Sequence, residues 1–397
     1  MLKKQFLLIY ILMVGVFGIL NTEMGVIGLL PYIARSFHIT IVEAGLLISL
    51  FALCVALAGP TMPLLCSRFN RKHVMLFVLG LFTVCNFISL MTDSFNILLA
   101  VRVLPAFFHP VYCSMAFSVA ASLTGPEKAP EAVAKINVGV SGGMVAGVPI
   151  CNFLAENISL SAAMAFLCIT TFIVFLATLF LVPSMPVKEK MTYGRQLAVL
   201  QRPVVWMSVA SVILLNGSVF GVFNYLADYL AQVTGIAPAL VSILLFVYGL
   251  CNILGSLLAG RLLSRRASFT VQGFPPALAA VYILLLTGGS SWPLAAGIIV
   301  LWGILGGINA NINQFWITRA APEAPDFANG LFLTAANLGT MSGTAVSGFF
   351  IESMGLEYVV FGGLAFIAAA AFLVYGQCHF LSMNPMRYRV AVKEAGA

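Results

Sequence analysis

The sequence predicts an all-α polytopic membrane protein with twelve transmembrane helices in two six-helix pseudo-repeat halves. Composition is the first indication, because 61% of the residues are hydrophobic and only 8% are charged. A soluble chain of 397 residues could not cover its surface with so few charges. The other two indications are apolar runs of membrane-crossing length and basic residues confined to one side of those runs. Lipid is therefore expected to surround most of the chain.

Twelve apolar segments have about the roughly 20 residues that cross a bilayer. In order they are 6–34, 42–66, 73–92, 95–122, 132–155, 159–182, 204–231, 240–263, 270–289, 293–318, 327–351 and 358–381. Because lipid satisfies no backbone polar groups, each segment is expected to form an α-helix. The glycines and prolines scattered through them do not fit the alternating pattern of barrel strands.

The net charge of +7 does not indicate a nucleic-acid partner, because of where the basic residues lie. With an inner N-terminus, all but Arg35 and Arg102 of the 20 basic residues fall in inner loops and tails. They are Lys3, Lys4, Arg68, Arg71, Lys72, Lys128, Lys135, Lys188, Lys190, Arg195, Arg202, Arg261, Arg265, Arg266, Arg319, Arg387, Arg389 and Lys393. This positive-inside distribution predicts that both termini are cytoplasmic. The first run is too long for a signal peptide and lacks a small-x-small cleavage site, so we expect an uncleaved helix.

One sizeable polar gap, 183–203, divides the chain into an N-terminal six-helix half, 1–182, and a C-terminal half with its cytoplasmic tail, 204–397. The other loops are too short for a soluble catalytic domain. No Gly-Lys-Ser/Thr phosphate loop occurs, which excludes ATP hydrolysis by this chain. The eight cysteines lie in apolar segments without CxxC spacing, so we expect buried thiols and neither a metal nor a cofactor.

The two halves resemble repeats of each other. The fifth span contains Asn137-Val-Gly-Val-Ser-Gly-Gly143, and the eleventh contains Asn337-Leu-Gly-Thr-Met-Ser-Gly343. Leu64-Leu-Cys-Ser-Arg68 after the second span is similar to Arg261-Leu-Leu-Ser-Arg265 after the eighth. The two matches have nearly the same separation along the chain, which favours duplication. Two six-helix halves are the architecture of many secondary transporters.

Ionisable residues inside the spans are the candidate functional groups. Glu23 lies in the first span and Arg102 in the fourth, where each would cost several kcal/mol without a partner or water. His109 is seven positions after Arg102, which places both on one helix face, and Pro105 and Pro110 predict a kink between and beside them. Glu23 can couple transport to protons, or it can pair permanently with Arg102 or a backbone group. His109 can relay protons or only hold helices together.

Other polar residues have the same two interpretations. Asp228 ends the seventh span and either serves the site or is merely solvated. The second half has amides that can bind substrate hydroxyls or ring nitrogens, or can link helices. They are Asn216, Asn224, Asn309, Asn311, Asn313, Gln314 and Asn337.

Several segments together resemble the major facilitator superfamily, in particular its drug/proton antiporter-1 branch with arabinose- and purine-efflux-like members. These segments are Asn21-Thr-Glu-Met-Gly-Val-Ile-Gly-Leu-Leu-Pro-Tyr-Ile-Ala34, Ala100-Val-Arg-Val-Leu-Pro-Ala-Phe-Phe-His109, Gly143-Met-Val-Ala-Gly-Val-Pro149 and Ala324-Pro-Asp-Phe-Ala-Asn-Gly330. The second is similar to the intramembrane arginine motif. The third is similar to the antiporter motif, in which the resemblance gives Gly139, Gly143, Gly147 and Pro149 the role of sealing the halves against proton leak.

The inner loop after the second span departs from the family pattern. The family reads G-x-x-x-D-R-x-G-R-R/K there, whereas this chain has Ser67 in place of the acid, followed by Arg68, Arg71 and Lys72. A serine carries no charge, so the family's acidic latch is in doubt. The basic residues then serve either as a gating motif or as positive-inside anchors.

The resemblance implies a monomeric, proton-coupled exporter of drugs, sugars or purine nucleosides in the bacterial inner membrane. It also implies that the first, fourth, seventh and tenth spans line a central cavity, which Glu23 and Arg102 would share. Protons and substrate would then compete at Glu23. A symporter or uniporter that imports a polar nutrient is the first alternative. A membrane enzyme or sensor is the second, but HExxH, GxSxG and CxxC motifs are absent.

Overall fold

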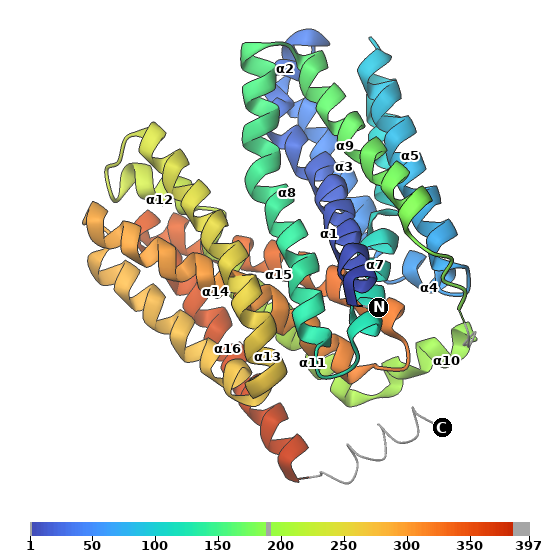
Figure 1. Ribbon diagram of the computed structural model, residues 1–397. Coiled ribbons are helices and arrows are strands. Elements are labelled where there is room, and N and C mark those ends of the chain that lie inside the picture. The colour runs from blue at the N-terminus through green and yellow to red at the C-terminus, as the bar shows by residue number, and fades with distance from the viewer. Residues whose placement is uncertain (1, 188–191, 384–397) are drawn as a thin grey trace. The chain divides into compact units, whose positions relative to one another are not determined.

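The computed structural model describes residues 2–187 and 192–383, and within these ranges the chain forms helices and no strand (Figure 1). The predicted all-α fold class is confirmed. Five of the basic residues assigned above to inner segments lie outside the described residues: Lys188, Lys190, Arg387, Arg389 and Lys393.

The chain divides into two compact units, Met1–Tyr193 and Gly194–Ala397. The boundary falls inside the polar segment 183–203. The first unit contains α1 (Leu2–Gly25), η1 (Val26–Leu29), α2 (Leu30–Ser36), α3 (Ile41–Ala58), α4 (Met62–Cys66), α5 (Arg71–Met91), α6 (Phe95–Ala106), α7 (His109–Thr124), α8 (Ala129–Asn157) and α9 (Leu160–Leu181).

The second unit contains α10 (Tyr193–Leu197), which begins at the boundary, η2 (Ala198–Gln201), α11 (Pro203–Phe223), α12 (Leu226–Gln232), α13 (Pro238–Gly288), α14 (Trp292–Ala320), α15 (Pro325–Met354), η3 (Leu356–Val359) and α16 (Val360–Met383). Its core is centred on aromatic rings. Trp302 of α14 is fully buried and lies edge-on to Tyr248, Tyr282 and Phe223.

Nine helical segments of the described residues are long and apolar enough to cross a membrane. One of them lies in the 51-residue α13, where Arg266 has non-helical φ/ψ and separates two helices. The 18-residue α3 is shorter, and the 30-residue α15 is less apolar. Dividing α13 and adding α3 and α15 gives segments that agree with the twelve predicted spans.

Three predicted spans of the first unit, the first, second and fourth, are interrupted, and the second is divided by the turn between α3 and α4. The first changes from α1 to the 3-10 turn η1 at Gly25 and resumes as α2, with Pro31 in its first turn. The fourth breaks at Phe107 and Phe108, between α6 and α7. The predicted kink at Pro105 and Pro110 is therefore a complete helix break, because each proline lacks the N–H that a continuous helix needs.

Helices α1 and α8 pack closely because glycines of α8 face α1. A methyl group added at Gly139 would lie 2.3 Å from the carbonyl oxygen of Met13, and one at Gly143 would lie 2.6 Å from Cβ of Leu20. A methyl group at Gly147 would lie 2.6 Å from Oδ1 of Asn21. Helix α8 continues through Pro149 without a break. Small residues let two backbones approach where lipid provides no hydrophobic drive for association.

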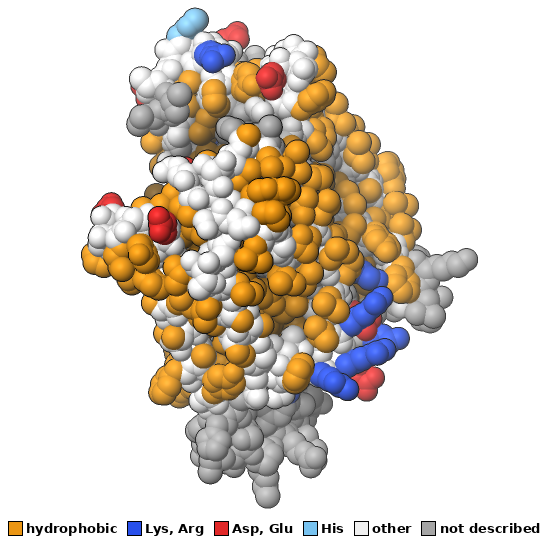
Figure 2. All heavy atoms as spheres, turned by 90° about the vertical axis from the view of Figure 1, so that its left-hand side faces the viewer, with side chains coloured by type: hydrophobic (Ala, Val, Ile, Leu, Met, Phe, Trp, Pro, Cys, Tyr) orange, Lys and Arg blue, Asp and Glu red, His pale blue; other side chains and the backbone are white. Residues whose placement is uncertain are grey.

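Hydrophobic side chains cover most of the face shown in Figure 2, and Lys and Arg side chains gather toward one end of it. Large apolar groups such as Phe180 and Phe372 are 76% and 80% exposed. Such surfaces are expected of helices that face lipid.

We predict that Gly139→Ala lowers the free energy of unfolding by about 1–3 kcal/mol, because the new methyl group would meet backbone that cannot rotate away. Gly45→Ala in α3 is the matched control, since nothing lies within 4 Å of the added group. Thermal unfolding of the purified protein in detergent measures both. Equal midpoints for the two variants would contradict the close α1–α8 packing.

Candidate functional site

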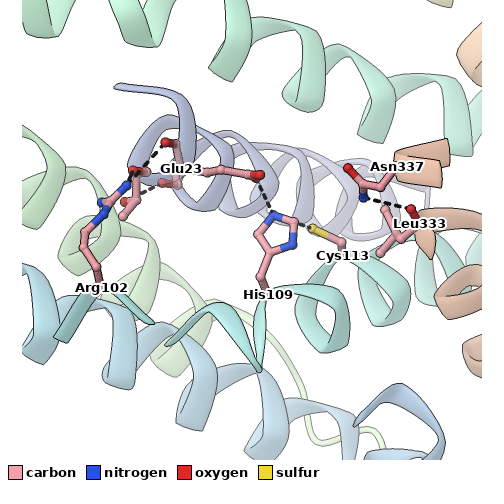
Figure 3. Close-up of polar contacts among 8 residues, drawn as sticks. Glu23, Arg102, His109, Cys113, Leu333 and Asn337 are labelled. Atoms are coloured by element: carbon pink, nitrogen blue, oxygen red, sulfur yellow. Dashed lines mark hydrogen bonds and ion pairs between the residues drawn. The ribbon is translucent and has the colours of Figure 1, made fainter. Parts of the chain in front are cut away.

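A carboxylate and an imidazole meet inside the first unit. Oε2 of Glu23, near the end of α1, lies 3.0 Å from Nε2 of His109, the first residue of α7. The side chains are 18% and 5% exposed. Figure 3 shows the two side chains directed toward one another. This distance fits a strong hydrogen bond with ionic character.

The contact uses one nitrogen of the imidazole ring. Nε2 also lies 3.9 Å from Sγ of Cys113, one helical turn further along α7, whereas Nδ1 is buried without a hydrogen-bond partner in the described structure. Either Nε2 donates to an ionised Glu23, or a protonated Glu23 donates to Nε2. The pair can therefore hold a proton on either group without changing its geometry.

Arg102 of α6 binds the backbone of the first span rather than the Glu23 carboxylate. Its Nη2 donates to the carbonyl oxygens of Thr22, at 2.7 Å, and Glu23, at 3.3 Å (Figure 3). These carbonyls lie in the last turn of α1, where it gives way to the 3-10 turn η1. A cation is also favoured at the negative end of the helix dipole. Arg102, which is 4% exposed, therefore stabilises the end of α1.

Arg102 and His109 consequently contact two different parts of Glu23, its carbonyl oxygen and its carboxylate. Phe51 of α3 adjoins both. The Arg102 guanidinium lies 5.5 Å from the ring centre, and the His109 ring meets it edge-on at 6.0 Å. Sequence reasoning missed Phe51, because one phenylalanine among 31 gives no signal. It also missed Cys113, although a spacing of four residues from His109 could have indicated it.

The loop between α4 and α5, after the second predicted span, contacts backbone carbonyl oxygens. Ser67 donates to the carbonyl oxygen of Leu64 at 2.6 Å. Lys72 Nζ donates to the carbonyl oxygen of Leu179 at 2.9 Å, at the end of α9. The backbone N–H of Arg71 donates to the carbonyl oxygen of Met185 at 3.1 Å.

Two further residues complete this loop. Asn70 caps α5 by accepting from the N–H of Lys72, and it also donates to Ser184. The Arg68 guanidinium lies 5.3 Å from the ring centre of Tyr193. The loop is thus held to the end of α9 and to the start of α10.

The antiporter-like glycines Gly139, Gly143 and Gly147 lie in the α1–α8 contact described above, and Pro149 follows them in α8. Gly143 and Gly147 contact α1 two to three residues before Glu23, and Gly139 contacts it at Met13. Asn21, which sequence reasoning did not single out, faces these glycines. It is fully buried, and neither amide atom has a hydrogen-bond partner in the described structure.

In the second unit the predicted amides bind one another and the backbone. Asn216 of α11 donates to the carbonyl oxygen of Ala336 at 2.7 Å and to Thr340 at 2.9 Å, and its Oδ1 lies 3.5 Å from Nδ2 of Asn313. Gln314 donates to Oδ1 of Asn329 at 2.7 Å. These contacts link α11, α14 and α15.

The remaining predicted residues of that unit differ in their contacts and exposure. Asn311 and Asn337 donate to Gly307 and Leu333 of their own helices, the second bond being drawn in Figure 3. Asn309 is buried with an unpartnered Oδ1 in the described structure. Asn224 donates to Thr344 at 2.8 Å and is exposed. Asp228 lies exposed in the first turn of α12.

The described residues contain no group of three or more His, Cys, Asp or Glu side chains placed to hold a metal ion. The candidate site of the first unit comprises the Glu23–His109 pair and Arg102, and the buried amides of the second unit are described separately. Such groups can bind and move protons and can hydrogen-bond a polar solute.

The chain matches the Major Facilitator Superfamily over residues 12–343. It is 29% identical to an inner membrane transport protein, YdhP, of Escherichia coli (strain K12), over 92% of this chain and 94% of that protein. It is 30% identical to an uncharacterized MFS-type transporter, YtbD, of Bacillus subtilis (strain 168), over 90% of this chain and 92% of that protein.

A probable sugar efflux transporter of Helicobacter acinonychis (strain Sheeba) is 27% identical, over 93% of this chain and 95% of that protein. The crystal structure of the human organic anion transporter MFSD10 superposes with a TM-score of 0.77 at 15% identity, over 93% of this chain and 99% of that one. That likeness concerns the fold. The chain is a multi-pass membrane transporter, not an enzyme, and it belongs to the Major Facilitator Superfamily.

Proposed function

We propose that this transporter exports small organic molecules from the cytoplasm in exchange for protons, by alternating access. The contact between Glu23 and His109 carries the proposal. It joins two titratable groups at 3.0 Å inside a membrane-spanning unit, and intramembrane acids typically mark ion pathways. The name of the Helicobacter relative supports an efflux direction.

Proton uptake and substrate binding would be linked at Glu23. An ionised Glu23 can accept hydrogen bonds from a polar or cationic solute, whereas a protonated Glu23 offers one acceptor fewer and no charge. Arg102 would keep the end of α1 in place in both states, because its partners are carbonyl oxygens that do not titrate. Drugs, sugars and purine nucleosides all remain substrate candidates.

We predict that Glu23→Gln abolishes transport driven by a pH gradient, because glutamine keeps the shape and hydrogen bonding of the side chain but cannot take up a proton. Flux of drugs, sugars and purine nucleosides in inside-out vesicles with an imposed pH gradient measures this. Glu127→Gln, an exposed acid in the loop before α8, is the matched control and should retain transport.

Three outcomes would contradict the proposal. Full pH-dependent transport by the Glu23→Gln variant would place the coupling site elsewhere. A wild-type flux that neither dissipates nor follows the gradient would exclude proton exchange. Substrate that moves in the same direction as the protons would identify a symporter.

We predict that His109→Gln changes the pH profile of transport while the free energy of unfolding changes by less than about 1 kcal/mol. Glutamine can still donate a hydrogen bond to Glu23 but cannot titrate, so the acid loses its protonatable partner. His73→Gln, at an exposed position of α5, is the control. An unchanged profile in His109→Gln would assign His109 a purely structural role.

We also propose that the transporter is a monomer in a bacterial inner membrane with both termini in the cytoplasm. The distribution of basic residues supports this orientation. A fluorescent protein that matures only in the cytoplasm should therefore be bright when fused to the C-terminus and dark when fused after His38, in the first outer loop. The reverse pattern would invert the topology.

A further inference from the structure

A small cavity adjoins Arg102, and neither Glu23 nor His109 lines it. Three polar residues line it, Arg102 of α6 with Asn86 and Ser89 of α5, and the rest of the lining is apolar. The space in it that is open to a water-sized molecule is about 10 Å³. That is room for one water molecule or one monatomic ion and too little for an organic solute.

The guanidinium of Arg102 has hydrogen-bonding capacity left for this cavity. Its Nη2 is occupied by the carbonyl oxygens of Thr22 and Glu23, but Nε is buried without a partner in the described structure. Ser89 offers a hydroxyl that now donates to the carbonyl oxygen of Cys85 at 2.8 Å. The Asn86 amide makes only long contacts, of 3.2–3.4 Å, to Thr22, Leu167 and Thr171. Arg102 can donate to an anion directly, whereas Ser89 and Asn86 would first have to turn away from their present acceptors.

The charge of Arg102 also favours an anion. The Glu23 carboxylate pairs with His109, and Arg102 binds carbonyl oxygens instead. Once the Glu23–His109 pair holds a proton, it no longer carries a net negative charge. Arg102 then remains a buried cation faced by carbonyl dipoles and the Phe51 ring. An uncompensated charge in a low-dielectric interior is costly.

We propose that this cavity binds a monatomic monovalent anion, a halide such as chloride, against Arg102, Asn86 and Ser89. The anion neutralises Arg102 without displacing its bonds to the end of α1. The apolar remainder of the lining, contributed by η1, α2, α3, α6 and α9, excludes larger oxyanions by size. The proposal does not depend on which solute the transporter carries.

Thermal unfolding of the purified full-length protein at one fixed pH tests the site, with sodium chloride replacing sodium gluconate at constant ionic strength. Chloride and bromide should raise the midpoint saturably, by on the order of 2 °C at about fivefold above the dissociation constant. Bromide in crystals should give an anomalous peak beside Arg102. Sulfate, which does not fit, should lack the saturable effect.

Ser89→Ala should lower the apparent affinity for halide about tenfold. The midpoint of its thermal unfolding in gluconate shows whether the variant folds. Thr83→Val is the matched control, because Thr83 lies in the same helix and its hydroxyl makes the same bond, 2.8 Å to the carbonyl oxygen four residues earlier, but does not line the cavity. The proposal would be overturned if sulfate stabilised the protein as much as halide does, or if the wild type showed no saturable halide effect. It would also be overturned if the two variants lost the same amount of halide affinity. In each case water would be the occupant of the cavity.

Discussion

The interrupted end of α1 is the constraint on which the site depends. Inside a membrane the carbonyl groups that a helix break exposes must find partners in the protein, because lipid supplies none. Arg102 provides them for Thr22 and Glu23. The break and the arginine are therefore stable together, since each would be costly without the other. This arrangement leaves the Glu23 carboxylate available to a different partner.

That partner is His109, and a second helix break brings it into position. Pro105 and Pro110 flank the interruption between α6 and α7, so His109 begins a new helix beside α1. Glu23 thus contacts the permanent cation Arg102 through its backbone carbonyl and the titratable ring of His109 through its carboxylate. The permanent contact fixes geometry, while the titratable contact can change charge. Separating these tasks suits a site that must take up a proton and keep its shape.

The two units differ in the chemistry of their buried polar groups. The first joins an acid, an imidazole and an arginine in one set of contacts. In the second, the buried amides of α11 and α14 bind backbone or one another, and a buried carboxylate, Asp326, lies in the first turn of α15. In the loop between α4 and α5, Ser67 stands where the family has an acid. Asn70 donates to Ser184, and the Lys72 ammonium donates to the carbonyl oxygen of Leu179, so the loop is held near the end of α9.

The sequence by itself determined the helical class, the approximate spans and the presence of Glu23, Arg102 and His109 at membrane depth, because hydropathy and charge are local properties. It placed Arg102 and His109 on one face of a continuous helix, whereas the structure has them in two helices, α6 and α7, from which they contact different parts of Glu23. Only the tertiary structure decided which part of Glu23 each one binds, and it added Phe51 and Asn21. Those contacts depend on how helices distant in sequence are rotated and on where they break. The helical period of 3.6 residues shows which residues share a face of one helix, but it does not show which helix packs against that face.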